Sequence, residues 1–221
     1  MRSVSYLALA AAALFAMPAQ AQDVGVEQGD FLVRLRGILV SPTETAGPIQ
    51  PGVPAGSVSV DDSIMPEVDF TYMLSDHVGA ELILATTKHD INGTGAVAGL
   101  GRVASTWVLP PTLTLQYHFA PKSHVRPYIG AGVNYTVFYS GETSSSLNGA
   151  LGATTIKLDD SFGYALQAGI DIDIGDNMFL NADVKYIDMD TTARLRTGPA
   201  TNTVDVSIDP LVFGLGVGVR F

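Results

Sequence analysis

Charged side chains recur at every second position in several segments of this chain, which is the spacing of residues on one face of a β-strand. Glu67 and Asp69 alternate with apolar residues, and Asp183 and Lys185 do the same in a later segment. Side chains of opposite sign that share a protected face can form ion pairs. The spacing therefore predicts charge pairing on one face of a β structure.

Arrangements that would indicate catalysis or a zinc site are incomplete. A lipid-hydrolysing barrel needs a Ser beside a His and an orienting acid, but His89 and the serines at 144–146 fall in different predicted loops. The histidines also lack the spacing of zinc ligands; they are His77, His89, His118 and His124. We therefore expect no catalytic residue, and the chain is not predicted to be an enzyme.

Two other motifs fail in their details. Asp171 and Asp173 resemble the start of a calcium loop, but Gly175 and Ala182 stand where that loop needs ligands. The glycines at 214, 216 and 218 suggest a nucleotide-binding loop, but no helical segment follows them. Neither a cofactor nor a metal ion is expected.

The first residues have the pattern of an export signal. Arg2 precedes a short apolar run over residues 4–15, Pro18 ends that run, and Ala19-Gln20-Ala21 is typical of a cleavage site. The run is too short to span a bilayer. Residues 1–21 are therefore predicted to be a signal peptide, and residues 22–221 one domain.

The composition favours a membrane β-barrel. The chain has no cysteine, so its fold must form without disulfides. Its net charge is −10, so nucleic acid is not an expected partner. Hydrophobic residues make up 47% and the mean hydropathy is +0.26, yet no uncharged apolar run of about 18 residues follows the signal. An exported apolar chain without a spanning helix is typical of a β-barrel.

Period-two alternation defines the predicted strands, clearest at residues 112–119. Short connections near 75–77, 120–125 and 175–177 alternate with long ones at 41–65, 89–102, 140–160 and 194–203, as in outer-membrane barrels with periplasmic turns and extracellular loops. We expect an eight-stranded antiparallel transmembrane β-barrel with both termini periplasmic. Its strands are expected near 31–40, 66–74, 78–88, 103–119, 126–139, 161–174, 178–193 and 204–221.

Aromatic residues near the strand ends are expected to form two girdles at the membrane interfaces. The predicted periplasmic girdle contains Tyr72, Tyr117, Phe119, Tyr128, Phe179 and Phe221, and the extracellular one Tyr135, Tyr139, Phe162 and Tyr164. A soluble barrel of the lipocalin type also alternates, but it places apolar residues inside. The charges on the small, Gly-rich face favour the membrane alternative, because charges facing lipid are costly.

Projecting the inward positions along the barrel predicts a lumen with two halves. The periplasmic half is expected to be an ionic plug of Arg34, Arg36, Asp69, Glu81, His118, Asp171, Asp183, Lys185 and Arg220. The extracellular half is expected to be an apolar ligand channel lined by Ile38, Val40, Val108, Pro110, Phe138, Ile187, Met189 and Val212. Side chains nearly fill a barrel of eight strands, so an apolar molecule could reach the plug but not pass it.

Pro110 and Pro111 fall in the middle of a predicted strand. Proline donates no ladder hydrogen bond, so the pair predicts either a lateral opening in the wall or a simple bend at a bulge.

Three segments resemble the OmpW family of outer-membrane β-barrels: residues 109–113, residues 127–136 and, most specifically, residues 181–192. This resemblance implies an eight-stranded barrel of the bacterial outer membrane that passes small hydrophobic molecules through a narrow channel. Outer-membrane lipid, lipopolysaccharide and small hydrophobic solutes are then the expected partners. A structural or adhesive barrel that acts through its loops is the alternative.

Overall fold

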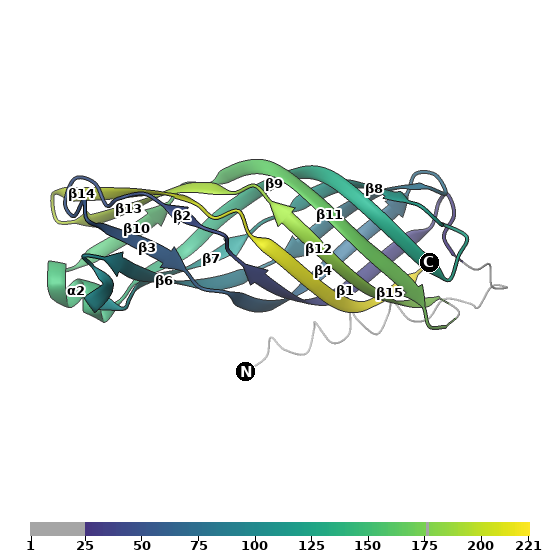
Figure 1. The fold of residues 1–221 in the computed structure, drawn as a ribbon, viewed down its shortest axis with the longest axis horizontal. Coiled ribbons are helices and arrows are strands. Elements are labelled where there is room, and N and C mark those ends of the chain that lie inside the picture. The colour runs from purple at the N-terminus through teal and green to yellow at the C-terminus, as the bar shows by residue number, and fades with distance from the viewer. Residues whose placement is uncertain (1–24, 176) are drawn as a thin grey trace, which may run out of the picture.

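The computed structural model describes residues 25–175 and 177–221, which form one elongated barrel of antiparallel strands (Figure 1). The predicted signal peptide, residues 1–21, lies outside the described residues. The carboxyl end of the chain lies at one end of the barrel, which we call the turn end (Figure 1). The other end carries a long second tier of strands, which we call the extension.

Among the described residues, eight strands form the barrel wall, as the sequence predicts. β1 pairs with both β4 and β15, which closes the sheet on itself. Closure leaves no free edge, and lipid requires this because hydrocarbon offers no partner for backbone N–H and C=O groups. In order around the wall the strands are β1 (Phe31–Ser41), β4 (Ser63–Met73), β5 (Val78–Ala85), β8 (Thr112–His118), β9 (Val125–Thr143), β11 (Ser161–Asp173), β12 (Met178–Ile187) and β15 (Leu211–Arg220).

The extension corrects the prediction of long loops at 41–65, 89–102, 140–160 and 194–203. These segments contain paired strands: β3, β6, β7 and the end of β9 form one sheet, and β10, β13, β14 and β2 form another. Their many Gly, Ser and Thr residues concealed a period-two pattern, such as Val58 and Val60 or Ile156 and Leu158. The elements are β2 (Thr45–Ala46), β3 (Gly56–Val60), β6 (Thr87–Gly95), η2 (Ala98–Leu100), β7 (Arg102–Leu109), α2 (Ser145–Leu151), β10 (Thr154–Leu158), β13 (Asp190–Thr197) and β14 (Ala200–Ser207).

Several predicted strands are divided where the wall meets the extension. The segment 103–119 is two strands, β7 and β8, separated by Pro110 and Pro111, and the segment 78–88 divides at Thr86 into β5 and β6. The segment 178–193 likewise divides into β12 and the start of β13, and the segment 204–221 into the end of β14 and β15. The predictions treated each as continuous because the alternation of side chains continues through the break. At each division the hydrogen-bonded ladder is interrupted, but the chain continues in the same direction.

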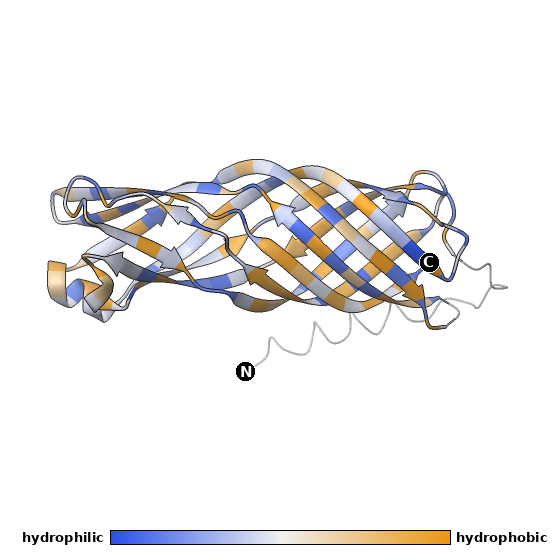
Figure 2. Ribbon diagram, in the orientation of Figure 1, coloured by the Kyte–Doolittle hydropathy of each residue, from blue (hydrophilic) through white to orange (hydrophobic). Residues whose placement is uncertain are grey.

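The outer surface of the wall is apolar, and polar and apolar residues alternate along its strands (Figure 2). Leu113 and Leu115 on β8 are each more than half exposed, whereas the alternate residues Thr112 and Thr114 are buried. No helix of the described residues is both long and apolar enough to cross a bilayer. The exposed apolar side chains of the wall occupy the outward positions of its strands.

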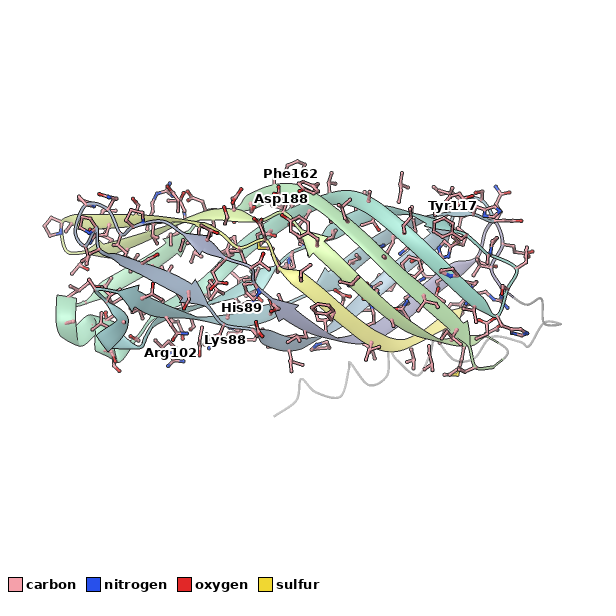
Figure 3. The ribbon with its side chains drawn as sticks, in the orientation of Figure 1. Lys88, His89, Arg102, Tyr117, Phe162 and Asp188 are labelled. Atoms are coloured by element: carbon pink, nitrogen blue, oxygen red, sulfur yellow. The ribbon has the colours of Figure 1, made fainter. Side chains whose placement is uncertain are left out.

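Exposed aromatic residues lie on the outer surface, with Tyr117 toward the turn end and Phe162 near the middle of the long axis (Figure 3). Two of the predicted girdle residues are not there. Tyr128 and Phe179 are each 1% exposed and point into the barrel. Their inward direction follows from the strand register, since Tyr128 pairs with the inward His118 and Phe179 with Gly218.

Gly132 on β9 permits a close approach between neighbouring strands. A Cβ atom there would overlap the carbonyl oxygen of Leu113 on β8, whereas a Cβ on Gly37 would meet open space. Because the obstructing atom belongs to the backbone, no side chain can move aside to accept the extra methyl group.

We expect Gly132→Ala to slow or prevent assembly of the barrel, and the matched control Gly37→Ala to leave it unchanged. The heat-modifiable mobility of the protein on gels, which separates folded from unfolded barrel, measures the effect. Equal folded fractions for the two variants would contradict the close approach of β8 and β9.

Candidate functional site

Arg34 on β1 forms the centre of one buried group of ions. Its guanidinium lies 2.9 Å from Asp171 Oδ2 and 3.2 Å from Glu81 Oε1, and it donates to Thr71 Oγ1 at 2.7 Å. The side chains of Arg34, Glu81 and Asp171 are fully buried. Strands β1, β5 and β11 are thus tied together across the inside of the barrel.

Arg36, two residues further along β1, binds a second group of carboxylates. Its nitrogens lie 3.0 Å from Glu67, 2.5 Å from Asp69 and 2.6 Å from Asp183. Lys185 Nζ completes the group at 2.6 Å from Glu67 and 3.0 Å from Asp183. We call the two groups together the plug: Arg34, Arg36, Glu67, Asp69, Glu81, Asp171, Asp183 and Lys185.

A mixed layer lies between the plug and the turn end. Arg126 pairs with Asp173 at 2.5 Å, and Tyr128 and Phe179 lie beneath the guanidinium of Arg34, with ring centroids 5.4 and 5.5 Å from its Cζ. The buried His118 contacts Gln116 in the same region. Arg126 is a neighbour of the plug that was not predicted, although it shares the inward alternation of Tyr128.

Arg220, which was predicted to belong to the plug, lies elsewhere. It is opposite Leu32 in the register of β1 and β15, near the end of the last strand, and it is only half-buried. Alternation correctly placed Arg220 on the inward face but could not give its depth.

Removing one partner from a buried ion network leaves the others uncompensated, at a cost of about 3–5 kcal/mol. We therefore expect Arg36→Met to lower the temperature at which the barrel unfolds on gels and to raise its single-channel conductance. Arg102→Met is the control, because Arg102 pairs with Asp90 at 3.3 Å on the exposed surface, where such pairs contribute little. Unchanged heat stability and conductance in Arg36→Met would refute the plug.

An apolar cavity of about 70 Å³ lies between the plug and the far end of the extension. All eight residues predicted to line the ligand channel line this cavity. Those that sequence reasoning missed come mainly from the extension: Val58, Val60, Ile91, Val103, Ile156, Leu158, Ala193, Leu195, Val204, Val206 and Ile208. A cavity of about 150 Å³ holds benzene, so a solute of that size could pass only if side chains moved apart.

The wall beside this cavity has an interruption that we call the seam, residues 84–86 and 109–111. The ladder between β5 and β8 ends at Ile83 and Thr112, and the ladder between β6 and β7 begins at Thr87 and Val108. Three residues lie between these points on each strand, so the register is the same on both sides and no residue is inserted.

The two prolines account for the seam. Tyr135 N donates to Pro111 O at 3.1 Å, so Pro111 faces β9 and Pro110 faces β5, since successive residues of a strand face opposite neighbours. Pro110 has no N–H to donate to β5. Its carbonyl oxygen accepts hydrogen bonds from Thr112 Oγ1 at 2.9 Å and Asn134 Nδ2 at 3.2 Å instead.

Comparison with known proteins agrees with this architecture. The model of the OmpW family matches residues 27–221. Outer membrane protein W of Escherichia coli (strain K12) is 37% identical over 222 residues, covering 100% of both chains. The dibenzothiophene metabolism operon protein PahQ of Pseudomonas aeruginosa is 30% identical over 172 residues, covering 76% of this chain and 77% of that one.

The crystal structure of the outer membrane protein OprG from Pseudomonas aeruginosa superimposes with a TM-score of 0.84 at 33% identity, covering 90% of this chain and 99% of the other. The resemblance seen in the sequence is therefore confirmed over nearly the whole of the described chain. This protein belongs to the OmpW family and is an eight-stranded β-barrel of the bacterial outer membrane.

Proposed function

We propose that this protein takes up small apolar molecules through its extracellular extension and releases them sideways through the seam into the outer leaflet. The observation that carries the proposal is that the apolar cavity ends directly on the plug. Glu67 and Lys185, which belong to the plug, also line the cavity. An apolar molecule gives up no hydrogen bonds to water when it enters such a cavity. It cannot, however, take the place of an ion-pair partner for the charged groups of the plug.

The axial route is unfavourable for such a solute. To continue toward the periplasm it would have to separate Arg36 from three carboxylates and Lys185 from two. Each separated charge would face an apolar molecule in a medium of low dielectric, which is among the largest costs in protein energetics. A side exit above the plug avoids this cost.

The seam supplies that exit at the right level. Ala85, which stands opposite Pro110 in the register, lines the cavity and is its smallest side chain together with Ala193. On the outer face, Thr86 Oγ1 lies 2.6 Å from Tyr139 Oη, a hydrogen bond that spans strand β7. If β5 and β6 separated from β7 and β8 at the seam, the hydrogen bond between Thr86 and Tyr139 would break. Few backbone hydrogen bonds would be lost, because the ladder is already interrupted there.

The relative PahQ supports the class of solute. Its name assigns it to an operon of dibenzothiophene metabolism, and dibenzothiophene is an uncharged aromatic molecule. If instead the barrel is structural or adhesive and acts through its extension, the cavity would hold no solute and the seam would have no effect on uptake.

Met189 lines the cavity and is 4% exposed. We expect Met189→Asp to lower uptake of a labelled apolar compound by cells at least about tenfold, because an unpaired charge in an apolar cavity repels such a ligand. Met189→Leu, which keeps the volume and polarity, is the matched control. Equal uptake by the two variants, with folding verified by gel mobility, would remove the cavity from the route.

The absence of cysteine allows the seam to be locked. We expect a disulfide between Thr86→Cys and Leu109→Cys, which face each other across the seam, to reduce uptake reversibly, with recovery on reduction. Leu82 and Leu113 face each other in the intact ladder below, so a disulfide at that pair is the matched control. Undiminished uptake by the oxidised seam pair would contradict the lateral exit.

A further inference from the structure

Three polar side chains interrupt the apolar cavity wall just above the seam. Thr87 and His89 lie two residues apart on β6, and Thr106 on β7 stands directly opposite His89. All three line the cavity and are at most 6% exposed. In Figure 3, His89 lies toward the inside of the barrel and its neighbour Lys88 toward the outside. We call Thr87, His89 and Thr106 the polar cluster.

The hydrogen bonds of His89 fix where its proton lies. Its Nδ1 is 2.9 Å from the carbonyl oxygen of Asp61, and a carbonyl oxygen can only accept, so Nδ1 carries the hydrogen. Burial lowers the pKa of His89, which lies in the extension, and this favours the neutral ring. Nε2 of that tautomer is an acceptor.

The hydroxyl protons of both threonines are also committed. Nε2 of His89 lies 3.0 Å from Thr87 Oγ1, so Thr87 is the donor of that hydrogen bond. Thr106 Oγ1 donates to the backbone, with the carbonyl oxygens of Trp107 and Tyr139 each 3.3 Å away. A hydroxyl has one proton and two lone pairs, so what remains on Thr87 and Thr106 is the capacity to accept.

We propose that the polar cluster binds a neutral hydrogen-bond donor, the hydroxyl of an alcohol or phenol, carried by an otherwise apolar solute on its way to the seam. This inference rests on the proposed function and narrows its substrate class. A ketone, an ether or a carboxylate carries only acceptor atoms, and their lone pairs would repel those of the polar cluster. An ammonium group could donate, but its charge would have to be desolvated in an apolar cavity.

The position of the polar cluster gives it a role in selection. Its rungs, Thr87 with Val108 and His89 with Thr106, are the first two inward-facing pairs above the seam. A solute in the cavity must pass them before it reaches Ala85 and Pro110. A hydrogen bond formed there would hold the solute beside the exit and orient its apolar part toward lipid.

The test compares uptake of labelled 1-decanol with uptake of its methyl ether, which has the same chain but no donor. Cells that lack the protein correct for passive permeation. We expect the protein to favour decanol by roughly three- to tenfold, the range that one hydrogen bond provides. Equal enhancement of both probes would overturn the inference and leave the proposed function standing. No enhancement of either probe would overturn both.

Variants separate hydrogen bonding from a structural role of the polar cluster. Combining Thr87→Val, His89→Phe and Thr106→Val should abolish the preference for decanol while uptake of the ether persists. Thr87→Val alone should retain the preference, because it uncovers Nε2 of His89, which is itself an acceptor. Thr191→Val is the matched control: this cavity threonine donates to Asp159 O at 2.7 Å on the β13 wall, away from the seam.

Parallel loss of both probes in the combined variant would show a structural role and overturn the inference. The comparison of the two probes on the unaltered protein needs no variant to fold, so it decides the matter even if the combined variant fails to assemble.

Discussion

The pairing of Arg34 and Arg36 with carboxylates from four other strands is the interaction on which this barrel depends. Both guanidinium groups are fully buried; Arg34 binds acids on β5 and β11, and Arg36 binds acids on the adjacent strand β4 and on β12. Charged groups could not sit at this depth without partners, because the interior offers no water to replace them. The plug therefore fixes the relative positions of β1, β4, β5, β11 and β12, and in the function proposed above it is also the barrier on the axial route.

Above the plug the same strands enclose a different medium. The inward residues of the extension are mostly Val, Ile, Leu and Ala, and two separate sheets face each other across them. The outer surface of the extension carries exposed charged residues such as Lys157, Arg194 and Asp205, unlike the apolar outer surface of the wall. In the proposed route an apolar solute would therefore meet an apolar environment in the extension before it reached the lipid.

The sequence was sufficient for the barrel, the inward and outward faces and the residues of the lower cavity, because period-two alternation determines all of these. It was insufficient for the extension, since a strand such as β14 is rich in Thr and Asn and resembles a loop when read alone; its pairing with β13 supplies the missing information. The sequence also did not give the position of every inward residue along the barrel axis. Arg220 was assigned to the plug because its depth depends on register, which only the neighbouring strand specifies. Tyr128 and Phe179 were assigned to the girdle because they lie near strand ends, although the alternation of their strands places them on the inward face.

The seam illustrates how a barrel can be weakened at one point without being distorted. An inserted residue would create a bulge and reverse the facing of every side chain beyond it unless the strand compensated. Pro110 instead removes a donor while the register stays the same on both sides, so the cavity residues beyond the seam keep their inward direction. The redirected carbonyl of Pro110 is satisfied by Thr112 and Asn134, so the closed wall is stable. Ion pairs thus tie the wall together at the level of the plug, and the ladder is interrupted just above it. In the proposed route, this interruption lies at the level where the plug would stop an apolar solute.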